Sequence, residues 1–365
     1  MNNRSAKRPN LNALYPNPLP VKVKALPPLF LHNPLSWIQY VAEYLFPEEV
    51  ERIKCRAVIH KSAGVSIVKV LAGKDQDTLW SMGFFGKGTL SRSDPSWFTR
   101  TSRRLNLEGS DQLPLTSEEI TQVRRQERKK FKEERAKAEQ QELENQKKLE
   151  KGEAIENVAE PVAPIRPSDI VKVDIESMKT GMRSEDADIV DDEGKLIQQE
   201  FMQLMPVEAF FLSSALGVLD VYDSEGNLLE GRKLLEALAN NDLEGFLNNY
   251  VVYHHFRSKG WCVRSGVKFG TDYLLYKRGP PFTHAEFAVM VVPTSQDEEQ
   301  NKKNCAEWWL ASSIGRVVGG VKKTLVYSYV EIPPLSSEFE LKLFLKASKV
   351  TDIVYRRWLP MRSRD

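Results

Sequence analysis

The sequence has few cysteines and no long apolar run. Its three cysteines, Cys55, Cys262 and Cys305, lie far apart and form no Cys-x-x-Cys pair, so a disulfide framework is excluded and a zinc knuckle is not expected. The apolar stretch at 209–219 is much shorter than the ~20 residues that a membrane span needs. Residues 1–20 lack the apolar core of a secretory signal. These absences predict a soluble intracellular protein from a reducing compartment.

Charge is distributed unevenly along the 365 residues. The net charge is only +2, but residues 1–42 hold five basic residues and no acid. Residues 169–200 hold ten acids and four bases. Six bases and two acids fall within 257–286, and seven bases and two acids within 341–365. Because the acidic segment offsets the basic ones, the near-neutral total does not exclude an RNA partner.

The composition divides the chain into four predicted parts. Residues 1–33 form a basic, Pro-rich arm, for which a disordered tail and an RNA contact are both open interpretations. Residues 34–94 and 201–240 predict a small N-terminal α/β domain. Residues 95–200 predict an interrupting insert and acidic linker that build no core. Residues 241–365 predict a C-terminal domain with a mixed sheet, so the predicted fold class is α/β (α+β).

The insert opens with a helix-capping pattern. Thr116 followed by Glu119 is typical of a capping box. The residues that follow, to about 155, are dense in charge of both signs, and their few large apolar residues form no coiled-coil seam. The pattern predicts either a solvated single helix or a disordered segment.

Hydrophobic periodicity predicts the remaining elements. Alternating β-branched residues indicate strands within 57–70, and Pro206 lies near the start of a helix that ends at about Gly217. Asn241 or Asp242 caps a further helix that Gly260 terminates. Strands are predicted at 262–267, 271–276, 284–292 and 324–331, and a helix at 307–318.

Tyr276 and His284 flank a short turn that contains Gly279, Pro280 and Pro281. A turn of this length returns the chain on itself, so the two side chains can face one pocket. Self-cleavage of RNA needs a base for the 2′-OH, an acid for the departing 5′-oxygen and a cation for the phosphate oxygens. Tyrosine, histidine and a nearby lysine suit these roles, although tyrosine and histidine also occur in strands without any catalytic role.

Other nuclease chemistries fit less well. No carboxylate cluster of the two-metal type is present, and Ala288 stands where an Asp…Glu-x-Lys nuclease has its lysine. Residues 79–93, which contain three glycines and basic groups, lack the spacing of a phosphate-binding loop for ATP, and the residue after Lys87 does not fit either. The cation that the phosphate oxygens require in RNA self-cleavage can come from Lys322 or Lys323. These two lysines lie between the 307–318 helix and the next strand.

Two segments of the sequence resemble a known family. Residues 261–287 and 316–323 resemble the catalytic subunits of the tRNA-splicing endonuclease. The resemblance implies a catalytic triad of Tyr276, His284 and Lys323, because the family's lysine is the second of the basic pair. The segment 84–93 and the charged insert resemble the subunit that cuts the 5′ splice site.

The resemblance also implies a mechanism and partners. Tyr276 deprotonates the 2′-OH, with Lys323 expected to lower its pKa, and His284 protonates the leaving oxygen. The products are a 2′,3′-cyclic phosphate and a 5′-OH, and neither a metal nor a cofactor is expected. Arg316 and Trp358 are the candidates for clamping a flipped bulge base, although Trp358 is equally consistent with a core anchor.

The expected partners are intron-containing pre-tRNA, a second catalytic subunit and two structural subunits of a heterotetramer. The expected location is the nucleus, with the cytosolic face of the mitochondrial outer membrane as the alternative. Two other functions stay open: the 3′-cutting catalytic paralogue, and a non-catalytic architectural subunit that binds tRNA.

Overall fold

The structure, a computed structural model, forms two compact units. The first unit comprises residues 1–10, 90–92 and 96–200, and the second comprises 11–89, 93–95 and 201–365. The residues that the structure describes are 3–7, 10–22, 26–30, 32–45, 52–62, 64–107, 115–150, 170–174, 184–191, 195–294, 307–335 and 339–356. No helix in these ranges is both long and apolar enough to cross a membrane.

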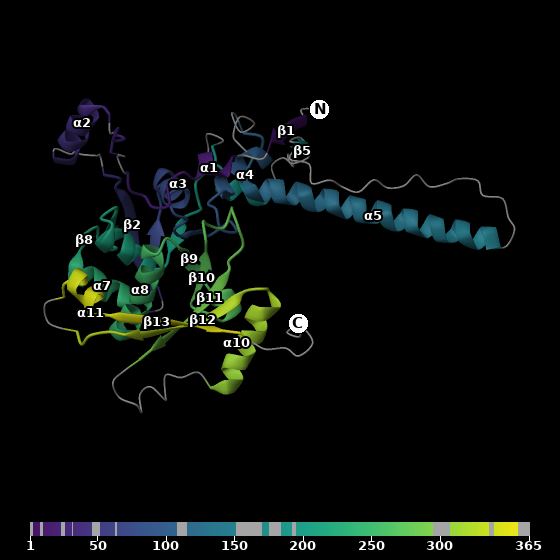
Figure 1. Cartoon of the computed structure of the whole chain (residues 1–365). Coiled ribbons are helices and arrows are strands. Elements are labelled where there is room, and N and C mark those ends of the chain that lie inside the picture. Colours follow the sequence, from purple (N-terminus) through teal and green to yellow (C-terminus); the bar gives the residue numbers. More distant parts are fainter. Residues whose placement is uncertain are drawn as a thin grey trace. The chain divides into compact units, whose positions relative to one another are not determined.

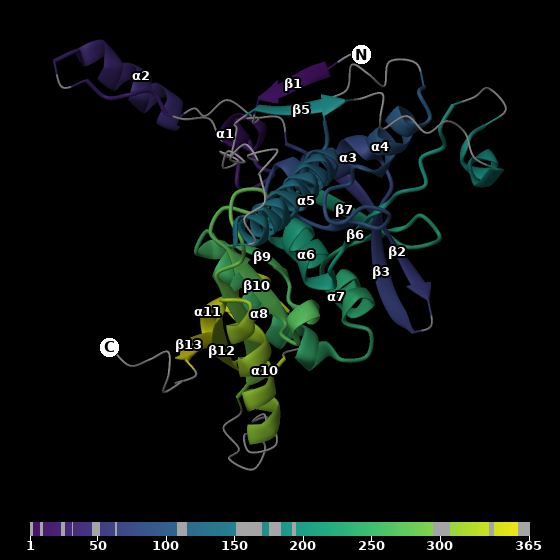
Figure 2. The same cartoon turned by 90° about the vertical axis from the view of Figure 1, so that its right-hand side faces the viewer.

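The second unit contains a six-stranded sheet with the order β4-β6-β3-β2-β7-β8. Its long strands β2 (Cys55–Ser62) and β3 (Val65–Val70) pair antiparallel (Figure 2). β2 pairs parallel with β7, and all other pairs are antiparallel. The remaining strands are β4 (Lys87–Gly88), β6 (Met202–Leu204), β7 (Leu219–Tyr222) and β8 (Leu228–Leu229).

The second unit also contains a five-stranded sheet with the order β13-β12-β11-β10-β9. Only β11 and β12 pair parallel. The strands are β9 (Cys262–Ser265), β10 (Tyr273–Tyr276), β11 (Phe287–Pro293), β12 (Thr324–Glu331) and β13 (Lys349–Tyr355). Helices of this unit are α1 (Leu11–Leu14), α2 (Pro34–Leu45), α3 (Gly73–Ser81), α6 (Pro206–Phe210), η4 (Phe211–Ala215), α7 (Gly231–Ala239), α8 (Leu243–Ser258), η5 (Val267–Phe269), α10 (Trp308–Gly320) and α11 (Leu341–Ala347).

Two apolar clusters cover opposite faces of the five-stranded sheet. Leu275, Val289 and Val326 belong to a large core that also contains α8 and the strands of the six-stranded sheet. Their sequence neighbours Leu274, Ala288 and Leu325 pack instead with Ile314 and Val318 of α10. Because successive strand residues point to opposite faces, α8 and α10 lie on different sides of the sheet.

The first unit is built around α4 (Trp97–Arg104) and α5 (Ser117–Glu150), which is one continuous helix of 34 residues (Figure 1). β1 (Asn3–Lys7) pairs antiparallel with β5 (Ile170–Asp174). The capping box that starts α5 is confirmed: Thr116 N–H donates to Glu119 Oε2 over 2.8 Å, and Glu119 N–H donates to Thr116 Oγ1 over 3.4 Å.

The α/β fold class and most predicted elements are confirmed. One correction concerns β11, which begins at Phe287 and not at 284. The chain first completes its turn, where the N–H groups of Phe282 and Thr283 donate to the carbonyl of Gly279. The hydrophobic periodicity did not predict three of the observed elements, namely β13, α3 and α11. The four-part division of the chain stays a prediction, although the core of the second unit includes residues from both 34–94 and 241–365.

The insert adds no described residue to either apolar cluster, and the statement that residues 95–200 build no core stays a prediction. The insert does enclose charged side chains, because Arg103, Glu119, Asp186 and Glu200 are buried. Arg103 forms an ion pair with Glu119 in which both side chains are enclosed. Removing one partner of such a pair typically costs about 3–5 kcal/mol of stability, because the other charge is left buried and unpaired. Of the two alternatives for 117–150, the structure has the solvated single helix.

Candidate active site

Three strand ends meet at one edge of the five-stranded sheet. Tyr276 is the last residue of β10, whereas β11 begins at Phe287 and β12 at Thr324. The antiparallel register sets Leu275 opposite Phe287, and the parallel register sets Phe287 opposite Thr324. The end of β10 and the starts of β11 and β12 therefore lie side by side.

Glu286 links these strand ends through its backbone. Its N–H donates to the carbonyl oxygen of Leu275 over 3.0 Å, and its carbonyl oxygen accepts from the N–H of Thr324 over 3.0 Å. His284 lies two residues earlier, is exposed and belongs to no strand. The segment that carries His284 is thus held between the residue before Tyr276 and the residue after Lys323.

The two lysines differ in backbone conformation and contacts. Lys322 has a φ of 56° and is exposed. Lys323 is half-buried, and its Nζ donates to the carbonyl oxygen of Ala285 over 3.2 Å and lies 5.4 Å from the ring centroid of Phe269. Ala285 directly follows His284. The structure therefore brings Lys323, and not Lys322, to the segment that carries His284.

Tyr276 is half-buried and packs against the apolar cluster beside α10. Burial raises the pKa of its hydroxyl, the Arg264 guanidinium opposes this by lowering the pKa, and Cys262 raises it further. The opposing cation is therefore Arg264, whereas the sequence suggested Lys323. A tyrosine with a raised pKa is almost entirely protonated at neutral pH.

The loop between Tyr276 and His284 rests on Phe84. Phe84 is 3% exposed, and its ring centroid lies 6.3 Å from that of Phe282 in the loop. Gly279 has a φ of 136°, and a Cβ added there would lie 2.2 Å from the Phe84 ring. Only glycine lets the loop backbone approach the ring this closely. Phe84 itself has a φ of 58°, a conformation that is strained for an aromatic residue.

Two arginines and a glutamate, of which Arg257 and Glu208 are buried and Arg264 is half-buried, hold the turn 83–86 that carries Phe84. Arg264 Nη1 donates to two carbonyl oxygens of this turn, over 2.6 and 2.5 Å, and Arg257 Nη1 donates to a third over 3.0 Å. Glu208 accepts from an N–H of the turn over 3.3 Å. Sequence reasoning missed these residues, because the arginines and their acceptors lie 174 to 180 positions apart.

Arg316 and Lys323 line one pocket of about 380 Å³ beside α10. Arg316 is exposed, and Tyr355 and Arg356 from the C-terminal end of β13 line the same pocket. The sequence did not single out these last two residues. Trp358, the other proposed clamp residue, lies outside the described residues. Within the described ranges, no group of three or more His, Cys, Asp or Glu side chains is placed to hold a metal ion.

Comparison with known proteins places the three strand ends within a known domain family. Residues 246–333 match the family model "tRNA intron endonuclease, catalytic C-terminal domain", which spans all three strand ends. The chain is 39% identical to tRNA-splicing endonuclease subunit SEN2 of Saccharomyces cerevisiae, over 96% of this chain and 97% of the yeast protein. It is 37% identical to the subunit of the same name from Eremothecium gossypii, over 99% and 100%.

A third relative is the probable tRNA-splicing endonuclease subunit sen2 of Schizosaccharomyces pombe, which is 34% identical over 96% of this chain and 98% of its own length. These similarities extend over both compact units and are not confined to the domain that matches the family model. The catalytic domain and the full-length relatives together show that the chain belongs to the SEN2 family of tRNA-splicing endonuclease subunits and has an endonuclease catalytic role.

Proposed function

We propose that this chain cuts intron-containing pre-tRNA at the 5′ splice site by a reaction that needs no metal ion. The observation that carries the proposal is the meeting of three strand ends. Tyr276 ends β10, His284 precedes β11, and Lys323 precedes β12 and donates to the carbonyl oxygen beside His284 over 3.2 Å. A base, an acid and a cation on adjoining strand ends are the groups that self-cleavage of RNA requires.

In this mechanism Tyr276 takes the proton of the 2′-OH at the splice junction. The 2′-oxygen then forms a bond to the adjacent phosphorus while the bond from phosphorus to the 5′-oxygen breaks. His284 gives its proton to the departing 5′-oxygen, and Lys323 stabilises the negative charge on the remaining phosphate oxygens. The products are a 2′,3′-cyclic phosphate and a 5′-OH, so the reaction has the outcome of a lyase.

The environment of Tyr276 sets the rate that this mechanism allows. Burial raises the pKa of the hydroxyl, so little phenolate exists at neutral pH. Arg264 lowers this pKa and also donates to the carbonyl oxygens of the turn that supports the loop. Arg264 therefore acts as a positioning residue with an additional electrostatic effect on the base.

The choice of the 5′ site rests on the resemblance of residues 84–93 to the 5′-cutting subunit. Arg316 contributes one half of a bulge-base clamp, and its pocket beside Lys323 supports this role. Trp358 is the proposed second half. The complete enzyme is a heterotetramer with a second catalytic subunit and two structural subunits. Its proposed location is the nucleus, with the mitochondrial surface as the alternative.

Cleavage of pre-tRNA by the reconstituted heterotetramer tests these roles. His284→Ala should reduce 5′ cutting by about 10²–10⁴-fold, as expected for loss of a general acid, and leave 3′ cutting unchanged. Loss of 3′ cutting alone would reassign the chain to the 3′-cutting paralogue. If both cuts survive, the chain is architectural. Retention of both cuts in excess chelator tests the absence of a metal requirement.

The lysine pair provides a matched control. Lys323→Ala should reduce the single-turnover rate of 5′ cutting by about 10²–10³-fold, because one stabilising donor to the developing charge is lost. Lys322→Ala removes the same charge one residue earlier and should leave the rate within about twofold. Equal losses in the two variants would contradict the assignment of Lys323.

A further inference from the structure

The first half of helix α5 carries a basic face. A helix turns by about 100° per residue, so residues 124–135 can be placed around its axis. An arc of about 140° contains six basic residues and no acid over this length. The acids of the same segment, Glu127, Glu133 and Glu134, lie outside the arc. The basic face consists of Arg124, Arg125, Arg128, Lys129, Lys132 and Arg135.

The basic face is open to solvent and largely unneutralised. Arg124 is half-buried, and the other five residues are exposed. Two pairs with acids on α5 occur in the described part, Lys129 with Glu133 over 3.8 Å and Arg135 with Glu139 over 2.8 Å. The Lys129 side chain is still 80% exposed in its pair. No described acid pairs with the remaining four basic residues.

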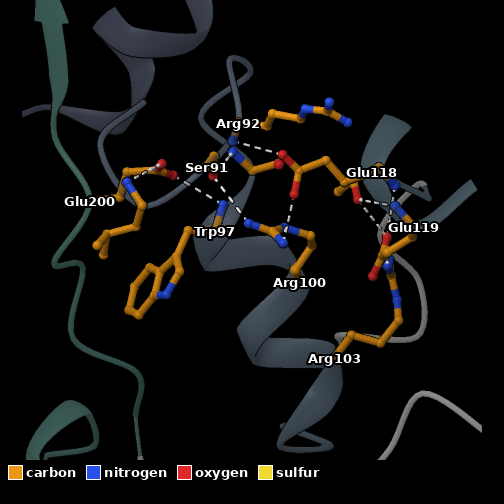
Figure 3. Close-up of polar contacts among 11 residues, drawn as sticks. Ser91, Arg92, Trp97, Arg100, Arg103, Glu118, Glu119 and Glu200 are labelled. Carbon is orange, nitrogen blue, oxygen red and sulfur yellow. Dashed lines mark hydrogen bonds and ion pairs between the residues drawn. The ribbon is translucent and has the colours of Figure 1, made fainter. Parts of the chain in front are cut away.

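Helix α5 is anchored at its base within the first unit (Figure 3). Glu118 Oε2 lies 2.7 Å from Arg100 Nη1 of α4, and Glu118 Oε1 accepts from the N–H of Arg92 over 2.7 Å. Glu119 forms the enclosed ion pair with Arg103 of α4. Because two consecutive residues of the first turn are held by α4, the direction of α5 relative to α4 is set. The basic face is therefore presented on a fixed support.

The dimensions and charge of this face suit a nucleic-acid backbone. From residue 124 to residue 135 the helix rises about 16 Å, at 1.5 Å per residue. A DNA duplex carries roughly one phosphate charge per 1.7 Å of its axis, and by this spacing about ten phosphate charges lie over the same distance. Double-stranded RNA is recognised mainly through its phosphates and shape, because its deep major groove excludes side chains. Arginine and lysine in a row can make such contacts without reading sequence.

We propose that the basic face of α5 binds the phosphate backbone of a base-paired arm of the precursor tRNA. This contact is additional to the groups at the strand ends and belongs to a different compact unit. It contributes substrate affinity and not bond cleavage. The proposal rests on the proposed function only in taking precursor tRNA as the substrate.

The test compares two double variants in the reconstituted heterotetramer. Arg128→Gln with Lys132→Gln removes two charges from the basic face. Lys130→Gln with Lys137→Gln removes two charges from the other side of the same helix, so the net charge of the two proteins is equal. Glutamine has a helix propensity close to that of lysine and arginine, so α5 should remain helical in both.

The dissociation constant for pre-tRNA is measured between 50 and 200 mM salt, together with the cleavage rate at saturating RNA. Each lost phosphate contact is worth up to about eightfold in affinity at 0.1 M salt and reduces the salt slope by about 0.9. The basic-face variant should bind about 10- to 60-fold more weakly at 0.1 M salt with a shallower slope. Its saturated cleavage rate should be unchanged, and the control variant should bind within about twofold of the wild type.

Three outcomes overturn the proposal: equal weakening by both variants, no weakening by either, or unchanged RNA affinity with weaker assembly of the heterotetramer. The last would identify an acidic protein surface as the ligand of the basic face. Survival of 5′ cutting in His284→Ala would refute the catalytic assignment and leave this affinity result unaffected, so the two failures are distinguishable.

Discussion

Truncation of Phe84 should uncouple cleavage from substrate binding. Phe84 is 3% exposed, and its ring supports Gly279 and Phe282 in the loop that joins Tyr276 to His284. The substitution Phe84→Ala removes this support without substituting Tyr276 or His284. We expect the loop to relax toward the vacated space, which alters the position of His284 relative to the strand ends.

The magnitude follows from two separate effects. Burial of the ring makes Phe→Ala cost about 3–5 kcal/mol of stability, through lost transfer energy and the cavity left behind. The φ of 58° at this position is unfavourable for alanine as well, so the substitution recovers none of the backbone strain. For the reaction, a misplacement of about 1 Å costs about 100-fold in rate.

The matched control is Phe210→Ala. Phe210 is 1% exposed and packs on Phe246 and Tyr250, away from the loop. Both variants should lower the thermal midpoint of the reconstituted complex by a similar amount. Only Phe84→Ala should lower the single-turnover rate of 5′ cleavage by about 100-fold, with the dissociation constant of pre-tRNA unchanged. The reasoning is refuted if the two variants lose the same cleavage rate, or if Phe84→Ala keeps the wild-type rate.

Three further predictions concern conformation, pH and thiol reactivity. Lys322→Gly should raise the thermal midpoint and retain 5′ cutting, because the φ of 56° costs a residue with a Cβ about 1 kcal/mol; a lower midpoint would contradict this. Burial raises the pKa of Glu208 above its unfolded value of 4.5, so its contribution to stability falls as pH rises above that value. The thermal midpoint of Glu208→Gln relative to wild type should therefore increase from pH 5 to pH 8, and a constant difference would exclude the effect. Burial, with Asp75 and Asp220, raises the pKa of the Cys55 thiol to about 12. Iodoacetamide at pH 8 should therefore leave it unmodified in the native protein and alkylate it after denaturation, as read by mass spectrometry.

Local sequence pattern was sufficient to predict an element where the interactions that determine it join residues close together in the sequence. Thr116 and Glu119 of the capping box lie three positions apart, and α8, which Asp242 caps, ends at Ser258, two residues before Gly260 with its φ of 86°. The strand at 324–331 was predicted with its observed ends. Such features depend on backbone conformation and on hydrogen bonds between near neighbours.

Contacts between residues that are far apart in the sequence could not be predicted from it. Nothing local separates Lys322 from Lys323, and the residues by themselves left both open until the family resemblance favoured the second. The parallel register of β11 and β12 is what sets Lys323 beside the segment of His284. Likewise the charge density of the insert gave no indication that Arg103 and Glu119 would be enclosed together.

The sequence by itself determined the kinds of group available, namely a tyrosine, a histidine and a lysine near strand ends, and the capping box that opens the charged insert. It left open whether the insert is a helix or disordered. Only the tertiary structure decided three features. Lys323 meets the segment that carries His284, Phe84 supports the loop before His284 on a turn that Arg257 and Arg264 hold, and α5 is anchored at its base by α4. The physical reason is that these contacts join residues far apart in the chain. The pairing of strands that are distant in sequence, such as β11 with β12, determines which of them meet.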